Sequence, residues 1–251
     1  NLTTVITLLT DGNQDTAVYH YDNLADPMQL SRVTHTHDGY PPSIALEYDA
    51  EGRMTLDEEG RTLGYDGAGR LNSISGEDVP WGTYGYDAFD RLVRQTIGPD
   101  DSMELYYRGE ERVNEVRRQS EQEIRLIKMG HSCIGVSDAR HLTLTAGDGN
   151  ESLLWSRSAG QTGGGSHHWS PYGQGQPTDL LPGFNGERAD PISGSYHLGN
   201  GYRAYNPTLM RFTCPDSLSP FGAGGINPYA YCLGDPVNRI DPTGHISWQG
   251  I

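Results

Sequence analysis

A Tyr-Asp segment recurs in the first half of the chain and constrains the fold more than any other feature. Three copies continue to an Arg followed by an apolar residue, and they read YDAEGRMT from Tyr48, YDGAGRLN from Tyr65 and YDAFDRLV from Tyr86. A further Tyr-Asp pair begins at Tyr21. The three copies start 17 and 21 residues apart (48 to 65, then 65 to 86). A period of about twenty residues indicates a repeat architecture.

The chemistry of one repeat predicts a β-hairpin. Asp together with Gly or Ala within five residues favours a tight turn. The flanking residues 92–97 alternate between two faces, which is the period-two pattern of a strand. Because a single hairpin is only marginally stable in water, the units must stack edge to edge. We expect the Tyr and Arg that the copies share to stack or hydrogen-bond between neighbouring units, as structural contacts rather than as a binding site.

The rest of the N-terminal region is also expected to be β-structure. Residues 103–116 and 123–136 both have the pattern of strands around a charged turn. Residues 111–129 lack Gly and Pro, so a helix stays open there, although recurring β-branched residues favour strands. A hairpin is expected across residues 147–150, and residues 159–168 form a Gly-rich exposed loop. The predicted fold class is therefore mostly β.

From His168 onward, Gly, Pro, Asn, Asp and Tyr dominate and few residues alternate. This composition is typical of compact, irregular structure with short strands, and one short helix is expected near residues 228–233. The three cysteines, Cys133, Cys214 and Cys232, are expected to be small buried hydrophobic residues. A bridge between Cys214 and Cys232 is compatible with their spacing but is not required by it.

Charge and hydropathy argue against two classes of partner. The chain has 18 Lys and Arg against 33 Asp and Glu, a net charge of −15. Such a chain is a poor nucleic-acid binder, because phosphate backbones require clustered Lys and Arg. Direct membrane insertion is not expected, since no apolar run approaches the roughly 18 residues of a membrane span. Because the sequence begins with Asn1 and carries no leader, we expect it to be part of a longer protein.

Together these segments resemble the C-terminal end of Rhs/YD-repeat proteins, close to the C subunits of bacterial toxin complexes. The Tyr-Asp repeats cover about residues 19–94. Residues 169–245 are similar to the Rhs-associated core of that family. The core markers are SPYG at 170–173, GFNGERADPISGSYHLGNGYRAYNP at 183–207, RF at 211–212, and PDSLSPFGAGGINPYAYCLGDPVNRIDPTGH at 215–245.

The resemblance implies a shell that is closed by a plug. Relatives wrap a β-sheet ribbon into a hollow cocoon, and the core closes one end while a variable toxin segment stays inside. For this chain it implies a shell segment of stacked hairpins over 1–158, a core plug over 159–245, and the start of the toxin segment at 246–251. The implied partners are the chain's own toxin segment as cargo, upstream shell repeats and a B-type shell subunit. The implied setting is a secreted or exported bacterial toxin component.

The family severs its chain directly after an Asp-Pro-x-Gly-x motif, which reads DPTGH at residues 241–245. The resemblance thus implies cleavage of the bond between His245 and Ile246. It also implies an intramolecular, single-turnover aspartyl autoprotease rather than an enzyme of multiple turnovers. Family members commonly carry Leu where this chain has His245. The family's two aspartates match Asp216 and Asp241.

Two carboxylates suffice for such a cut, and we expect no cofactor and no metal. Held close together they share one proton, so the ionised carboxylate takes a proton from water and the protonated one donates to the leaving nitrogen. Asp235 is a third candidate, although its place before Pro236 is typical of a turn. Arg211 is expected to pair with a carboxylate or to orient the cut strand, unless its role is purely structural.

Other chemistry is poorly supported by the sequence. Two histidine pairs occur, His35 with His37 and His167 with His168. Neither pair has Cys or Glu at the spacing of zinc ligands. Cys214 and Thr213 lie close to Asp216, but no nucleophile elbow or Cys-His signature accompanies them.

A second function stays open beside autoproteolysis. A β-repeat protein on a cell surface would use exposed Tyr and Trp for adhesion or glycan binding, without any cleavage. The core block with its Asp-Pro-Thr-Gly motif favours the autoproteolytic function.

Overall fold

The Tyr-Asp segments form tight turns between antiparallel strands. In the copy at Tyr65, the Asp66 carboxylate accepts the backbone N–H groups of Ala68 at 2.9 Å and of Arg70 at 3.0 Å. The Arg70 Nε donates to the same carboxylate at 2.8 Å. Gly69 supplies the left-handed φ of 83° that this turn requires. The same Asp-to-Arg bonds close the other two copies, which confirms the prediction of one hairpin per copy.

The shared Tyr and Arg join neighbouring hairpins, as expected from the sequence. The Arg70 guanidinium lies 4.4 Å from the centroid of the Tyr86 ring in the next unit. The Tyr86 hydroxyl donates to the carbonyl of Leu71 at 2.7 Å. One unit further, Arg91 lies over Tyr107 at 5.1 Å. The units at Tyr65 and Tyr86 therefore each contribute the cation and the carbonyl that hold the aromatic ring of the next unit.

The structure contains one more unit, which the Tyr-Asp pattern does not reveal. Asp57 accepts the Arg61 backbone N–H at 2.9 Å and the Arg61 Nε at 2.6 Å, as in the other turns. This turn joins β6 (Met54–Leu56) to β7 (Thr62–Tyr65), and Leu56 stands where the other copies have Tyr. The pattern Asp-x-x-Gly-Arg, without Tyr, would have found it.

The computed structural model describes residues 1–77, 79–178 and 180–249. The hairpins form two antiparallel sheets, in which each strand pairs with the strands that precede and follow it in the sequence. The first sheet contains β1 (Thr4–Leu8), β2 (Gln14–His20), β3 (Arg32–Thr34) and β4 (Ser43–Ala45). Besides β6 and β7, the second contains β5 (Glu47–Tyr48), β8 (Leu71–Ser75), β9 (Gly82–Tyr86), β10 (Leu92–Ile97), β11 (Asp101–Arg108), β12 (Glu111–Arg117), β13 (Gln122–Met129), β14 (Ser132–Ser137), β15 (Leu142–Gly147), β16 (Leu153–Ser158) and β17 (Gly165–Ser166). The mostly β fold class is confirmed, as are strands over residues 111–129 and the hairpin at 147–150.

The C-terminal region consists of short elements, and the described residues include no α-helix. Its elements are β18 (Tyr196–Leu198), β19 (Arg203–Asn206), β20 (Arg211–Phe212), β21 (Arg239–Ile240), β22 (Trp248–Gln249), and the 3₁₀ turns η1 (Phe184–Gly186), η2 (Gly199–Gly201) and η3 (Cys232–Gly234). The short helix predicted near residues 228–233 is reduced to the 3₁₀ turn η3 at its end, because Ala230 instead forms a β-bridge with Arg211 and Leu233 has a left-handed φ of 55°. Part of the expected loop at 159–168 forms β17, which pairs with β16.

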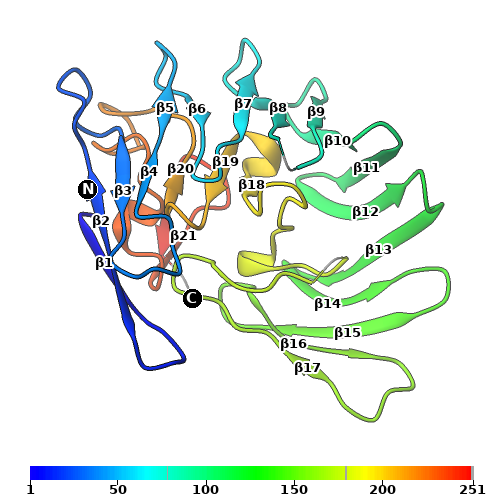
Figure 1. The fold of residues 1–251 in the computed structure, drawn as a ribbon. Helices are drawn as coiled ribbons and strands as arrows, with labels where there is room; N and C mark the ends of the chain where they lie inside the picture. Colours follow the sequence, from blue (N-terminus) through cyan, green and yellow to red (C-terminus); the bar gives the residue numbers. More distant parts are fainter. Residues whose placement is uncertain (78, 179, 250–251) are drawn as a thin grey trace.

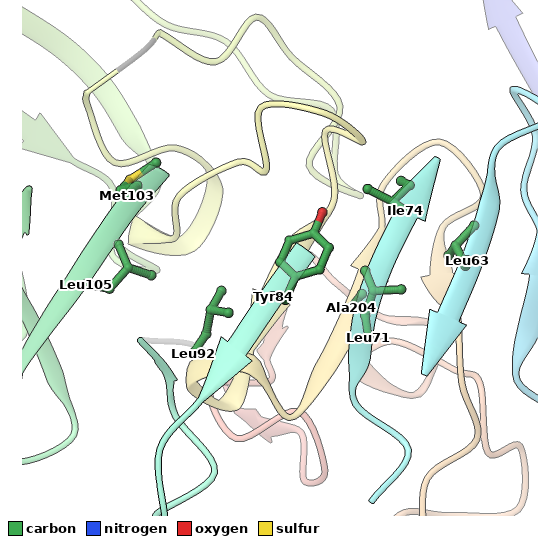
Figure 2. Close-up of a cluster of buried hydrophobic side chains, with 8 residues drawn as sticks. All are labelled: Leu63, Leu71, Ile74, Tyr84, Leu92, Met103, Leu105 and Ala204. Carbon is green, nitrogen blue, oxygen red and sulfur yellow. The ribbon is translucent and has the colours of Figure 1, made fainter. Parts of the chain in front are cut away.

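The two sheets form an arc, and the C-terminal elements lie on its inner side (Figure 1). Side chains of the second sheet pack against β19 in a buried cluster (Figure 2). Its members are Leu63, Leu71, Ile74, Tyr84, Leu92, Met103, Leu105 and Ala204. Apolar burial therefore fixes the C-terminal region against the concave face of the repeats.

A buried carboxylate joins the second sheet to the C-terminal region. Asp190 accepts hydrogen bonds from the Tyr84 hydroxyl at 3.0 Å and the Gln95 amide at 2.7 Å. His197 Nε2 lies 3.2 Å from the same carboxylate, and the Ser193 backbone N–H donates at 2.8 Å. Burial alone would raise the pKa of Asp190. The hydrogen bond and charge of His197, together with the Ser193 N–H, lower this pKa below its ordinary value. The carboxylate is thus ionised and fully partnered inside the protein.

A second buried carboxylate lies where the Asp57 turn meets β19. The side-chain amide of Asn206 donates to both Glu58 oxygens, at 2.9 and 2.8 Å. Burial, with the neighbouring Asp57 charge, raises the pKa of Glu58 to about 7. The folded protein therefore binds this proton more tightly than the unfolded chain does.

All three cysteines are free, and Cys214 and Cys232 are buried. The bridge that the sequence left open is therefore not formed. Within residues 1–77, 79–178 and 180–249, no helix is long and apolar enough to cross a membrane.

Replacing Asp66 by Asn should lower the free energy of unfolding by about 1–2 kcal/mol at pH 7, because a charge-assisted bond is lost. Burial would raise the pKa of Asp66, but Arg70 and the turn amides lower it overall. The wild-type advantage should therefore be present above about pH 4 and disappear at lower pH. Denaturant unfolding at pH 7 and pH 3 measures this. The exposed Asp38→Asn serves as control, and equal losses in both variants would contradict the prediction.

Replacing Glu58 by Gln should stabilise the protein at pH 8 by about 3 kcal/mol and change little at pH 4. The sign follows from the raised pKa of Glu58, since wild-type stability falls as pH rises from 4.5 to about 7. Urea unfolding across this range measures the difference. Glu59→Gln, whose side chain is 60% exposed, should show no gain at pH 8. A Glu58→Gln protein that is less stable than wild type at pH 8 would refute the assignment.

Candidate functional site

Asp216 lies in the loop after β20 and is 4% exposed. One carboxylate oxygen accepts the Leu218 backbone N–H at 2.9 Å and lies 2.7 Å from His245 Nδ1. The other oxygen accepts the Arg203 Nη2 at 3.1 Å. A guanidinium, an imidazole and an amide N–H therefore all face this carboxylate.

Arg203, on β19, connects Asp216 to the segment that carries the DPTGH motif. Its Nη1 donates to the Pro228 carbonyl at 2.9 Å, and its Nε donates to the Gly244 carbonyl. The guanidinium lies 3.6 Å from the centroid of the Phe212 ring. Arg203 is only 2% exposed, and burial lowers its pKa although Asp216 opposes that shift. Arg203 therefore holds the Asp216 carboxylate close to residues 241–245.

Asp241 follows β21 and is also 4% exposed. Burial is the main cause that raises the pKa of Asp241, and the negative charge of Asp216 raises it further. Arg203 and the Thr243 hydroxyl oppose the shift without cancelling it. Two carboxylates that share one cation thus have different surroundings, and Asp241 is the one that favours the protonated form.

Thr243 connects Asp241 to the bond expected to be cut. Its hydroxyl donates to the Asp241 carboxylate at 3.4 Å. The same oxygen accepts the backbone N–H groups of His245 at 3.2 Å and of Ile246 at 3.0 Å. The His245 ring stacks on Tyr202, with ring centroids 3.8 Å apart. Asp216 therefore contacts the side chain of His245, while Asp241 reaches its backbone through Thr243.

The other two predicted residues lie in different surroundings. Asp235 accepts hydrogen bonds from the Asn238 side chain at 2.9 and 3.1 Å, which is the arrangement of a turn. Arg211 donates to the Met28 carbonyl at 2.5 Å and to the Tyr21 hydroxyl at 3.4 Å. Arg211 thus connects the C-terminal region to the N-terminal residues, and the arginine that contacts Asp216 is Arg203.

Competing nucleophiles and ligands have other partners. Burial raises the pKa of the Cys214 thiol to about 12, so the thiolate needed for attack is scarce. The Thr213 hydroxyl donates to the Ala204 carbonyl at 3.2 Å. His35 Nδ1 lies 2.7 Å from Asp15. Among the residues that the structure describes, no group of three or more His, Cys, Asp or Glu could hold a metal ion.

Sequence reasoning missed three residues of the site, namely Arg203, Tyr202 and Thr243. Thr243 had a usable signal, since it lies within the DPTGH motif and its hydroxyl can bond two residues ahead. Tyr202 and Arg203 lie in GYRAYNP, where nothing nearby in sequence indicates a buried carboxylate as partner. Only the folded chain brings this segment to Asp216.

Comparisons with known proteins identify the fold. No family model matches the chain. The toxin protein Tse5 of Pseudomonas aeruginosa is 44% identical over 63 residues, which are 25% of this chain and 4% of that protein. The crystal structure of TcdB2-TccC3-Cdc42 matches 94% of this chain and 14% of that chain, with 16% identity and a TM-score of 0.64. The Photorhabdus luminescens Tc holotoxin pore with an Asp-to-Ala mutation in TccC3 matches 94% of this chain and 13% of that chain, with 15% identity and a TM-score of 0.63.

The resemblance to Rhs/YD-repeat proteins and toxin-complex C subunits is thus confirmed. The chain shares the fold of the matching part of these solved structures. At 15% and 16% identity the solved structures show a shared fold alone, and the chain spans only a small part of each relative.

Replacing Arg203 by Met in this Rhs-like chain should lower the free energy of unfolding by about 3–5 kcal/mol, because Asp216 would stay buried without its cation. Denaturant unfolding measures the loss, and the double variant Arg203→Met/Asp216→Leu should recover part of it. Arg108→Met is the control, since Arg108 is 72% exposed and should cost about 1 kcal/mol at most. Equal losses in the Arg203 and Arg108 variants would show that the buried pair is not needed.

Proposed function

We propose that this chain is the end segment of an Rhs shell that encloses a C-terminal toxin and cuts its own backbone between His245 and Ile246. The convergence of Asp216 and Asp241 on residue 245 carries the proposal. The cut is an intramolecular event that happens once per molecule. It needs neither a metal nor a cofactor, because the two carboxylates supply both a base and an acid.

The different surroundings of the two carboxylates assign their roles. Asp216, which faces Arg203 and His245, acts as the base and takes a proton from the attacking water. The water oxygen forms a bond to the His245 carbonyl carbon. Asp241, whose pKa burial raises, supplies the proton that the Ile246 nitrogen needs when the carbon–nitrogen bond breaks. The products are a carboxyl group on His245 and an amine on Ile246, and the proton count of the pair is unchanged.

The proposed shell role rests on the way the two sheets surround the C-terminal region. The repeats form an arc around the C-terminal region, which lies on the concave side (Figure 1). We propose residues 1–158 as shell, 159–245 as plug and 246–251 as the start of the toxin segment. Because an arc does not enclose a volume, upstream repeats and a B-type shell subunit would complete the cage. In this proposal the protein is a component of a secreted or exported bacterial toxin.

Purified chain should lose residues 246–251, and mass spectrometry should find a product that ends at His245. Asp216→Asn and Asp241→Asn should each abolish the cut, because one carboxylate alone cannot provide both proton transfers. Asp235→Asn is the matched control and should be cut at the wild-type rate. Far-UV circular dichroism verifies that each variant is folded.

Two outcomes would contradict the proposal. Normal cutting of both Asp variants would eliminate the carboxylate pair. A folded wild-type chain that stays intact at 251 residues would favour adhesion or glycan binding without cleavage.

A further inference from the structure

The Thr243 hydroxyl contacts three groups at the bond between His245 and Ile246. It lies 3.4 Å from the Asp241 carboxylate, 3.2 Å from the His245 nitrogen and 3.0 Å from the Ile246 nitrogen. None of the other contacts described for Asp241 reaches the Ile246 nitrogen. The proposed acid and the proposed leaving group are therefore connected by this one hydroxyl.

The backbone holds Thr243 in this position. Gly199 lies so close that a Cβ on it would come within 2.2 Å of the Thr243 carbonyl oxygen. Gly199 also has a φ of 62°, so only glycine fits without strain. Four residues further along the chain, Arg203 donates to the Gly244 carbonyl. The backbone at Thr243 and Gly244 is thus held by two contacts, and a group that transfers protons needs such a fixed position.

We infer that Thr243 is a catalytic residue of the proposed cut, whose hydroxyl passes a proton from the Asp241 carboxyl to the Ile246 nitrogen. This inference rests on the proposed cleavage. Before the cut, the Ile246 N–H donates to the Thr243 oxygen. As the carbon–nitrogen bond breaks, the nitrogen becomes pyramidal, turns its new lone pair towards Thr243 and takes the hydroxyl proton. The Thr243 oxygen simultaneously receives the Asp241 proton. Asp241 ends ionised, Ile246 ends as an amine, and the Thr243 hydroxyl is restored.

The bonds of Thr243 also suit a purely structural role, since a Thr hydroxyl that accepts N–H groups two and three residues ahead stabilises a turn. The two roles differ in what they require. A structural role needs an acceptor for two N–H groups, whereas the relay needs a hydroxyl that both gives and takes a proton during the reaction. The cleavage rate and its solvent isotope effect distinguish them.

The test measures the cleavage rate of the whole chain by mass spectrometry after refolding from denaturant. Thr243→Val has the same shape without the hydroxyl and should slow the cut about 100-fold, in the range of general acid catalysis. Thr243→Ser keeps the hydroxyl and should cut within about fivefold of wild type. Wild type and Thr243→Ser should be slower in D₂O, and the residual reaction of Thr243→Val should lose most of this effect. If Thr243→Val does not fold, Thr243→Ala takes its place.

Thr145→Val is the matched control. Thr145 lies in β15, and its hydroxyl also bonds a backbone group, donating to the Cys133 carbonyl at 2.7 Å. It should lose stability and keep the wild-type cleavage rate. Folded Thr243→Val that cuts as fast as wild type would overturn the relay and leave the carboxylate pair intact. A folded wild type that never cuts would overturn the proposed function and the relay with it.

Discussion

The fold depends on charged groups that are buried between the sheets and the C-terminal region, each with a partner from the other side. Asp190 receives donors from β9 and β10, and Arg211 donates to the Met28 carbonyl. A buried charge that loses its partner costs about 3–5 kcal/mol, a large fraction of the stability of a domain. The sheets and the C-terminal region must therefore form together. The candidate site, which lies inside that region, exists only when the repeats are in place.

Local chemistry made most of the fold predictable. One Asp and one Arg four positions apart close each turn through their own bonds, so the hairpins follow from short segments of sequence. The unit at Asp57 was not predicted because the repeat was defined by its Tyr, whereas the turn depends on the Asp and the Arg. The helix expected near residues 228–233 failed for a different reason. Packing rather than helix propensity determines the left-handed φ of residues such as Leu233.

The site was predictable only in part. The resemblance indicated Asp216 and Asp241. In the structure Asp216 contacts the His245 ring, whereas Asp241 is connected to the His245 backbone only through the Thr243 hydroxyl. Arg203 could not be predicted, because no motif or fixed spacing relates it to Asp216, which lies 13 residues further along the chain. The raised pKa of Asp241 could not be predicted either, because it depends mainly on how deeply the folded chain buries this side chain.

The last strand affects the fate of the severed segment after a cut at residue 245. β22 lies beyond that bond and is paired with β21 before it, with Trp248 opposite Ile240 and Gln249 opposite Arg239. Severing the backbone would leave these ladder contacts untouched, so the new amino terminus would remain docked beside its former neighbour. Cleavage of the bond and release of the segment after it would then be separate steps with separate energy barriers. Because the β21–β22 ladder has only two residue pairs, a small conformational opening of this region would be enough to release the segment.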